Sequence, residues 1–243
     1  MMHEIIRRWA DANNFPLPKQ NEALLLHFTH KIYLSGKKFN LTGLKNEQDI
    51  LEKLVIGSLD PVFSMNVPRG TLFIDIGSGA GIPGIPLAIV FENCHGVLVD
   101  SNHKKISFIN SIIDELKLKN ISALCGRIEE LARGEFRNKF HCAFSRAMAN
   151  MYLLVEIAAP LIRTGGFLYM YSSLNRDDLD EKSIDHCARV GMELVALEDH
   201  ARFGFKENGI LIQKRFETDA LYPRKISLIN REQKKIHNAV KHD

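Results

Sequence analysis

The stretch that decides the fold is Phe73-Ile-Asp-Ile-Gly-Ser-Gly-Ala-Gly-Ile-Pro-Gly84. An apolar run reaches Asp75, and the glycines Gly77, Gly79 and Gly81 follow it. Glycine adopts positive φ angles and lets the main chain approach a ligand closely. Pro83 suits the first turn of a helix, where its missing N–H costs nothing. The pattern predicts a strand, a glycine loop and a helix, with a ligand crevice beyond the carboxyl end of the strand.

Short apolar runs and longer helical segments alternate on the carboxyl side of this stretch. The expected strands are 71–77, 96–100, 121–126, 141–146, 166–172, 192–198 and 209–216, and the expected helices between them are 84–92, 103–118, 128–133 and 149–163. Such alternation is typical of an α/β, Rossmann-like fold, with a mostly parallel sheet covered by helices on both faces. The turn at 206–209 favours a closing antiparallel hairpin.

The two flanking segments differ from this core. Residues 1–67 are predicted to be a helical N-terminal segment, including a helix over 47–59 with Asn46 as its N-cap. Residues 68–218 are expected to form the catalytic domain. Residues 219–243 form a basic tail with little to bury, which is either solvated or in contact with nucleic acid.

Bulk composition excludes several classes. The chain has 243 residues, of which 45% are hydrophobic and 25% charged, with a net charge of +3. These values are typical of a soluble globular protein. The four cysteines contain no Cys-x-x-Cys pair, so reduced thiols are expected rather than a zinc site or a disulfide. The longest apolar stretch, 82–91, is too short to span a bilayer. We expect a cytoplasmic monomer with no metal and no membrane partner.

The glycine loop also matches the G-x-G-x-x-G pattern of dinucleotide enzymes, at Gly79, Gly81 and Gly84. That pattern alone is a weak signal. Asp75 would repel a pyrophosphate, whereas S-adenosylmethionine (AdoMet) carries an ammonium group that suits a carboxylate. Counted from Gly77, the third glycine of a dinucleotide site would fall on Ile82. The run therefore predicts an AdoMet-dependent methyltransferase rather than a dehydrogenase, while a plain tight turn is the structural alternative.

The next two strand ends offer further contacts to the ligand. Asp100 can take the ribose hydroxyls of an adenosine, although it is also placed to cap the helix that begins near His103. Ile128 and Glu129 follow the third strand, where they can meet the adenine or simply start a short helix.

Several segments together resemble a known family. FIDIGSGAGIPGIPLAIV, LVDSNHKKISFI, LKLKNISALCGRIEE, FSRAMAN, the upstream FNLTGL and the later Tyr222-Pro-Arg-Lys225 resemble the bacterial ribosomal small-subunit methyltransferase G family, also called glucose-inhibited division protein B. The resemblance implies AdoMet-dependent methylation of N7 of a guanosine in 16S ribosomal RNA. It implies that AdoMet contacts Gly77, Ile82, Ile128, Glu129 and Arg146. Asp75, Gly79 and Asp100 stand where class I methyltransferases generally hold the methionine and ribose portions.

Arg146, Arg224 and Lys225 are the candidate RNA contacts. A guanidinium at the end of the fourth strand can stack on a base or pair with phosphate, and a structural ion pair is the alternative for Arg146. If the tail is an RNA contact, deleting residues 222–243 is expected to reduce the salt dependence of RNA binding and to leave AdoMet binding intact.

The chain also departs from the resemblance. Leu54 and Gly57 stand where many members have His and Asp, and Ser172-Ser173 stands where many have Lys-Gly. These departures keep two alternatives open: a methyltransferase of the same fold that acts on another RNA or a small molecule, and a non-catalytic protein that binds AdoMet or RNA.

Overall fold

The computed structural model describes residues 1–39, 41–65, 67–146, 150–172, 179, 181–200 and 207–240. Its centre is a seven-stranded sheet in the order β3-β2-β1-β4-β5-β7-β6. The strands are β1 (Leu72–Ile76), β2 (His95–Asp100), β3 (Ile121–Cys125), β4 (Phe140–Ser145), β5 (Ile162–Ser172), β6 (Met192–His200) and β7 (Glu207–Lys214). Neighbours among β1–β5 pair in parallel, whereas β7 runs antiparallel to both β5 and β6. All seven predicted strands are present, and β6 and β7 form the predicted antiparallel pair. The turn predicted at 206–209 is wrong, because β7 already begins at Glu207, and β5 begins at Ile162, inside the helix predicted over 149–163. Strands β2 and β4 flank β1, so the strand order changes direction beside β1.

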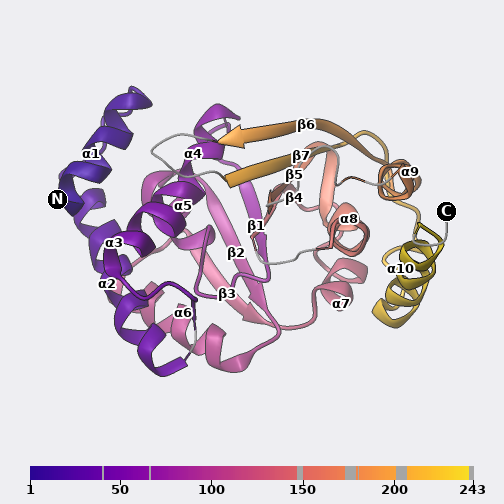
Figure 1. Cartoon of the computed structure of the whole chain (residues 1–243), viewed down its shortest axis with the longest axis horizontal. Helices are drawn as coiled ribbons and strands as arrows, with labels where there is room; N and C mark the ends of the chain where they lie inside the picture. The colour runs from indigo at the N-terminus through magenta and orange to yellow at the C-terminus, as the bar shows by residue number, and fades with distance from the viewer. Residues whose placement is uncertain are drawn as a thin grey trace.

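Helices cover both faces of this sheet (Figure 1). One layer contains α1 (Met2–Ala12), α2 (Lys19–Phe39), α4 (Gly57–Ser64), α5 (Gly84–Val90) and α6 (His103–Leu116). The other contains α7 (Ile128–Arg133), α8 (Met151–Ala158), the short η2 (Ala159–Leu161), α9 (Glu181–Arg189) and α10 (Ile226–Val240). The pleat of β1 divides its side chains between the layers: Phe73 packs with the first, and Ile74 and Ile76 with the second.

The N-terminal segment shares the core of the sheet. Trp9 is fully buried and packs edge-on against Phe63, with ring centroids 5.0 Å apart. Both residues belong to the hydrophobic cluster that contains Phe73 of the central strand. The helices of residues 1–67 therefore form part of one layer over the sheet rather than a detached unit.

The helix predicted over 47–59 has an unexpected interior. Asn46 caps it as predicted, because its side-chain oxygen accepts a hydrogen bond of 2.7 Å from the Asp49 amide. The segment then divides into α3 (Glu47–Asp49), a π-helix η1 (Ile50–Ile56) and α4. Runs of π-helix are rare and occur frequently at functional sites.

The C-terminal segment is folded, not merely solvated. Residues 226–240 form the helix α10, and Ile229 on it is completely buried. The expectation that residues 219–243 have little to bury is therefore wrong, because the helix packs its apolar side chains against α8. The helix α9 was also not predicted. In the described residues, no helix is long and apolar enough to cross a membrane.

Candidate cofactor site

The glycine loop joins β1 to α5 through backbone conformations that favour glycine. Gly77, Gly79 and Gly81 have φ angles of 72°, 58° and 87°. The amides of Gly77 and Ser78 both donate to the carbonyl of Val99 on β2, at 2.8 and 3.0 Å. These bonds fix the start of the loop at the carboxyl ends of β1 and β2, where the sequence predicted a ligand crevice.

Asp75 lies under this loop and is fully buried. Its Oδ2 accepts a hydrogen bond of 2.9 Å from the amide of Gly84, the first residue of α5. Its Oδ1 has no hydrogen-bond partner among the described residues. Burial, with a smaller contribution from the charge of Asp100, raises the pKa of Asp75 to about 7. A buried carboxylate with one unpaired oxygen is a site prepared for a cation.

Ser78 is a candidate that the sequence reasoning missed. Its Oγ is buried and has no hydrogen-bond partner in the described part of the chain. Serine is common in turns for conformational reasons alone, so its position between two glycines gave no separate signal. The two oxygens without a described hydrogen-bond partner, Asp75 Oδ1 and Ser78 Oγ, thus belong to residues three positions apart in the chain.

Asp100 is already heavily engaged. Its Oδ1 accepts from the Asn102 amide at 2.9 Å, and its Oδ2 accepts from the Gly79 amide at 3.0 Å and from Lys105 Nζ at 3.4 Å. A carboxylate has about four lone-pair sites, so one is left for a ribose hydroxyl. A second hydroxyl needs Gly79 or Lys105 to release its bond. The helix α6 is capped by Asn102, not by Asp100.

A cavity of about 180 Å³ opens beside these groups. Four of the predicted cofactor residues line it: Gly77, Asp100, Ile128 and Glu129. Its other lining residues are Ile76, Val99, Ser101, Gly126, Arg127, Ile157 and Ile226. Most of the side chains in that set are apolar, which suits the faces of a purine ring.

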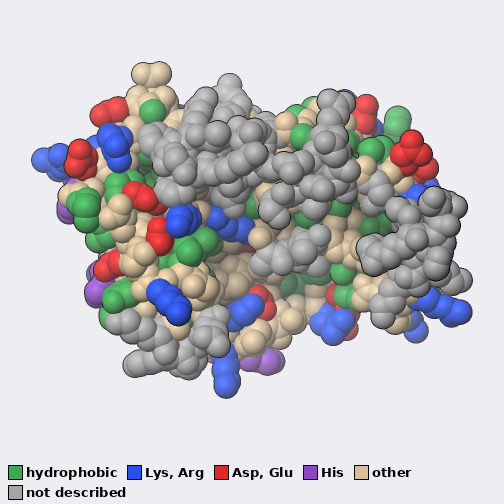
Figure 2. Space-filling view, viewed as in Figure 1, with side chains coloured by type: hydrophobic (Ala, Val, Ile, Leu, Met, Phe, Trp, Pro, Cys, Tyr) green, Lys and Arg blue, Asp and Glu red, His purple; other side chains and the backbone are tan. Residues whose placement is uncertain are grey.

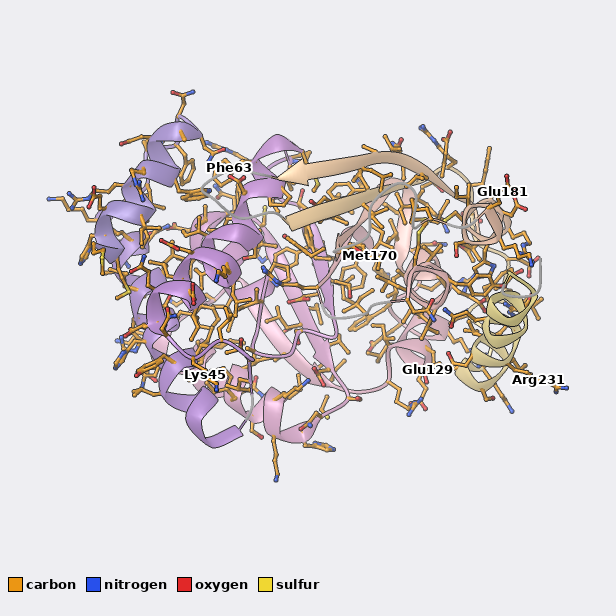
Figure 3. All side chains as sticks on the ribbon, viewed as in Figure 1. Lys45, Phe63, Glu129, Met170, Glu181 and Arg231 are labelled. Carbon is orange, nitrogen blue, oxygen red and sulfur yellow. The ribbon has the colours of Figure 1, made fainter. Side chains whose placement is uncertain are left out.

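The remaining predicted residues lie outside the lining of this cavity. Gly79 is joined to it through its bond to Asp100, whereas Asp75 lies on β1 next to Ile76, which lines the cavity. Ile82 is buried in the hydrophobic cluster of the first helix layer, with 6% of its surface exposed. Glu129 does line the cavity, and its carboxylate also accepts a 2.6 Å bond from Arg127. Figure 3 labels Glu129 on α7, on the side of the molecule that holds α10.

Arg146 follows β4 and reaches across to the π-helix. Its Nη1 donates to the carbonyl of Leu54 at 3.1 Å, and its Nη2 to that of Lys53 at 2.5 Å. Its guanidinium carbon also lies 5.4 Å from the ring centroid of Tyr171 on β5. Tyr171 in turn donates to the carbonyl of Ser58, at 2.5 Å. Arg146 therefore ties the sheet to η1, and its positive charge lowers the pKa of Asp75 against the larger effect of burial.

Arg224 and Lys225 are in contrasting surroundings. The guanidinium of Arg224 bonds both oxygens of the buried Glu156 and one oxygen of Glu232. Lys225, the next residue, is exposed. The ion-pair geometry gives Arg224 a structural role, whereas Lys225 is available to a partner.

The comparisons with known proteins agree with this geometry. The model of the family described as rRNA small subunit methyltransferase G matches residues 21–199. The chain belongs to this family. The ribosomal RNA small subunit methyltransferase G of Lachnoclostridium phytofermentans is 36% identical over 76% of this chain and 78% of its own. That of Clostridium botulinum strain ATCC 19397 is 35% identical over 85% of this chain and 88% of its own.

Solved structures support the fold. M. jannaschii TYW2 in complex with AdoMet has a TM-score of 0.51 and 13% identity, over 67% of this chain and 77% of that chain. TrmN from Thermus thermophilus has a TM-score of 0.52 and 14% identity, over 66% of this chain and 48% of that chain. As a member of the rRNA small subunit methyltransferase G family, the chain is an AdoMet-dependent methyltransferase of ribosomal RNA.

Its residues fit that cofactor. The buried lone oxygens of Asp75 and Ser78 suit the ammonium end of AdoMet, and the apolar cavity suits its adenine. Two of the departures from the family pattern, Leu54 and Gly57, lie in or next to the π-helix that Arg146 contacts. Ser172 ends β5, and Ser173 lies outside the described residues.

Proposed function

We propose that this chain transfers the methyl group of AdoMet to N7 of a guanosine in 16S ribosomal RNA. The observation that carries the cofactor assignment is the pair of buried, unpartnered oxygens on Asp75 and Ser78 beside an apolar cavity. Family membership supports the RNA substrate. We expect the enzyme to act in the cytoplasm as a monomer on small-subunit ribosomal RNA.

Each cofactor residue has a distinct task. Asp75 holds the ammonium group of the cofactor by charge, and Ser78 accepts a hydrogen bond from it. Gly77 and Gly79 bring the main chain close to the ligand, Asp100 accepts a ribose hydroxyl, and Ile128 packs on the adenine face. We keep Ile82, buried in the core, and Glu129 as candidates for contact through their main-chain groups.

The bound cofactor supplies a methyl group on a positively charged sulfonium. Neutral guanine N7 has a lone pair and no proton, so the protein needs no general base at this atom. Its task is to hold N7 in line with the sulfur–methyl bond, and such positioning supplies much of the rate. Arg146 is suited to this task, because it joins the end of β4 to the π-helix and is close enough to Asp75 to shift its pKa.

The RNA surface is proposed along the rim of the cavity. Lys104, Arg127 and Lys225 are exposed on or beside the N-terminal turns of α6, α7 and α10, and Arg231 is exposed on the second turn of α10. Ser101, Arg127 and Ile226, which line the cavity, stand at these same helix starts. Figure 2 shows Lys and Arg side chains spaced along this edge, and Arg231 extends outward in Figure 3. We assign the tail contact to Lys225 rather than Arg224, whose charge already pairs with Glu156 and Glu232.

The activity is tested by incubating the protein with labelled AdoMet and small-subunit ribosomal RNA that lacks its methyl groups. Label at guanosine N7 is the expected result. Label at another atom or on another RNA would replace the substrate assignment. AdoMet binding without transfer to any RNA would favour a non-catalytic protein.

Arg146→Ala should lower single-turnover transfer at saturating AdoMet far more than it lowers AdoMet affinity. Contacts made mainly in the reacting complex reduce turnover, whereas loss of uniform binding only raises KM. Arg146→Lys should rescue poorly, because one ammonium cannot reproduce a planar fork that meets two carbonyls. Near-normal transfer by the alanine variant would restrict Arg146 to a structural role.

A further inference from the structure

The C-terminal helix contributes to the wall of the cofactor cavity. Ile226, its first residue, lines the cavity together with Ile157 of α8 and Ile128 of α7. The other lining residues come from β1 and β2, from the loops that follow β1, β2 and β3, and from the start of α7. A residue about 150 positions after the glycine loop thus faces the same space as Gly77.

The backbone leading to Ile226 is held by hydrogen bonds at Pro223 and Arg224, among other residues. Arg133 of α7 donates to the carbonyl of Pro223 through Nε at 2.9 Å and Nη2 at 2.6 Å. Glu156 of α8 accepts from the backbone amide of Arg224 at 2.8 Å, and from Arg224 Nε at 2.9 Å. Because both anchors lie on helices that also line the cavity, they fix Ile226 relative to the cavity itself.

The spacing of residues on α10 gives the helix one inward face. Ile226, Ile229 and Gln233 are three and four residues apart, which places them on one side of a helix. Ile229 is completely buried, and Gln233 bonds Asn150, the cap of α8. Leu228 lies on another side and is 50% exposed. Ile226 therefore points inward by the register of the whole helix.

We propose that Ile226 contacts the adenosine half of the cofactor, and that Glu156 and Arg224 are positioning residues that hold it there. The ligand class is an adenine nucleoside, whose base offers an apolar face to the branched side chain. This inference rests on the proposed cofactor site. It reverses the expectation that residues 222–243 can be deleted without affecting AdoMet, since the deletion removes a wall of the cavity.

The test compares Ile226→Ala with Leu228→Ala, a matched truncation on the same helix that touches no part of the cavity. Calorimetry measures the affinity of the full-length chain for S-adenosylhomocysteine and for 5′-methylthioadenosine, which lacks the amino-acid half. Ile226→Ala should weaken both ligands by the same factor, about tenfold, because the lost apolar contact is with the shared nucleoside. Leu228→Ala should bind both like the wild type.

Wild-type affinity in Ile226→Ala would overturn the proposal, as would a loss confined to S-adenosylhomocysteine. Failure of the wild type to bind either ligand would instead overturn the cofactor assignment, and this inference with it. For the positioning residues, Arg224→Met should raise the KM for AdoMet and leave the kcat of the folded enzyme unchanged. In Arg224→Lys the KM should lie between that of the methionine variant and that of the wild type. A fall in kcat with unchanged KM would contradict that role.

Discussion

The glycine loop and the α8–α10 contact each bury a carboxylate completely, and the two carboxylates are in opposite states. Asp75 has one bonded oxygen and one without a described partner, and burial raises its pKa to about 7. Glu156 has both oxygens bonded by Arg224, and His186 Nε2 lies 3.0 Å from it. The neighbouring His186 imidazole and the hydrogen bonds from Arg224 outweigh its burial and lower the pKa of Glu156 to about 2. We infer that the carboxylate of Asp75 is left available for a ligand, whereas that of Glu156 holds α8 and α10 together.

The largest effect is expected in the loop. Gly77→Val should leave no measurable AdoMet affinity, because Gly77 lines the cavity and a Cβ branch would occupy the space of the ligand. Gly70→Val is the control, because Gly70 also has a positive φ, of 77°, but lies in open space. Calorimetry should show binding by the control alone. Unchanged affinity in Gly77→Val would remove the loop from the cofactor site.

The next effect concerns the paired carboxylate. Glu156→Gln should lower the free energy of unfolding by about 3 kcal/mol at pH 7, because the partly buried Arg224 loses the charge of its completely buried partner. Glu232→Gln should cost about 0–1 kcal/mol, because Glu232 is partly exposed. Denaturant titration measures both. Since the folded pKa of Glu156 is lowered, its contribution is complete above the unfolded value of 4.5 and is lost as pH falls towards 2. Equal costs for the two variants would contradict this distinction.

A smaller effect is expected from the pH dependence of Asp75. Its folded pKa is raised from 3.8 to about 7, so the free protein loses stability as pH rises between these values. The ammonium group of AdoMet prefers the ionised form. Affinity should therefore be about tenfold weaker at pH 6 than at pH 8. Calorimetry at pH 6 in buffers of different ionisation enthalpy should detect proton release, and Asp75→Asn should abolish it. Proton release that persists in Asp75→Asn would assign it to another group.

The smallest effect is expected at the surface. Lys225→Ala should reduce the slope of log affinity for single-stranded ribosomal RNA against log salt by about 0.7, the value for one phosphate contact. Lys139→Ala is the control. Lys139 is exposed just before β4, at the amino ends of the parallel strands, whereas the cavity lies at their carboxyl ends. Filter binding across a salt series measures both slopes. Identical slopes in the two variants would exclude Lys225 as a phosphate contact.

The sequence predicted the sheet and four of the eleven residues that line the cavity, because those features depend on local patterns. Strand periodicity placed β1, β2 and β3, and the residues at their carboxyl ends then meet by topology alone. Asn46 was recognised as a cap for the same reason, since capping uses neighbours in the chain.

Features made by distant segments could not be predicted in this way. The place of Ile226 in the cavity depends on a bond between Arg224 and Glu156, which are 68 residues apart. The π-helix has the same apolar spacing as an ordinary helix over a short stretch, so periodicity did not reveal it. The sequence did not single out Ser78, because what makes it a candidate is a buried hydroxyl with no described hydrogen-bond partner. Only the packed structure defines that property.

The π-helix has a consequence for insertions and deletions. Its hydrogen bonds span five residues instead of four, which is equivalent to one extra residue within an α-helix. Deleting one residue between 50 and 56 would let the segment become a regular α-helix, with no loss of helical hydrogen bonding. The carbonyls of Lys53 and Leu54 would then turn away from Arg146, which now bonds them both. We therefore expect that this segment cannot lose even one residue without losing its bonds to Arg146. Substitutions of its side chains should be tolerated better than a change of its length.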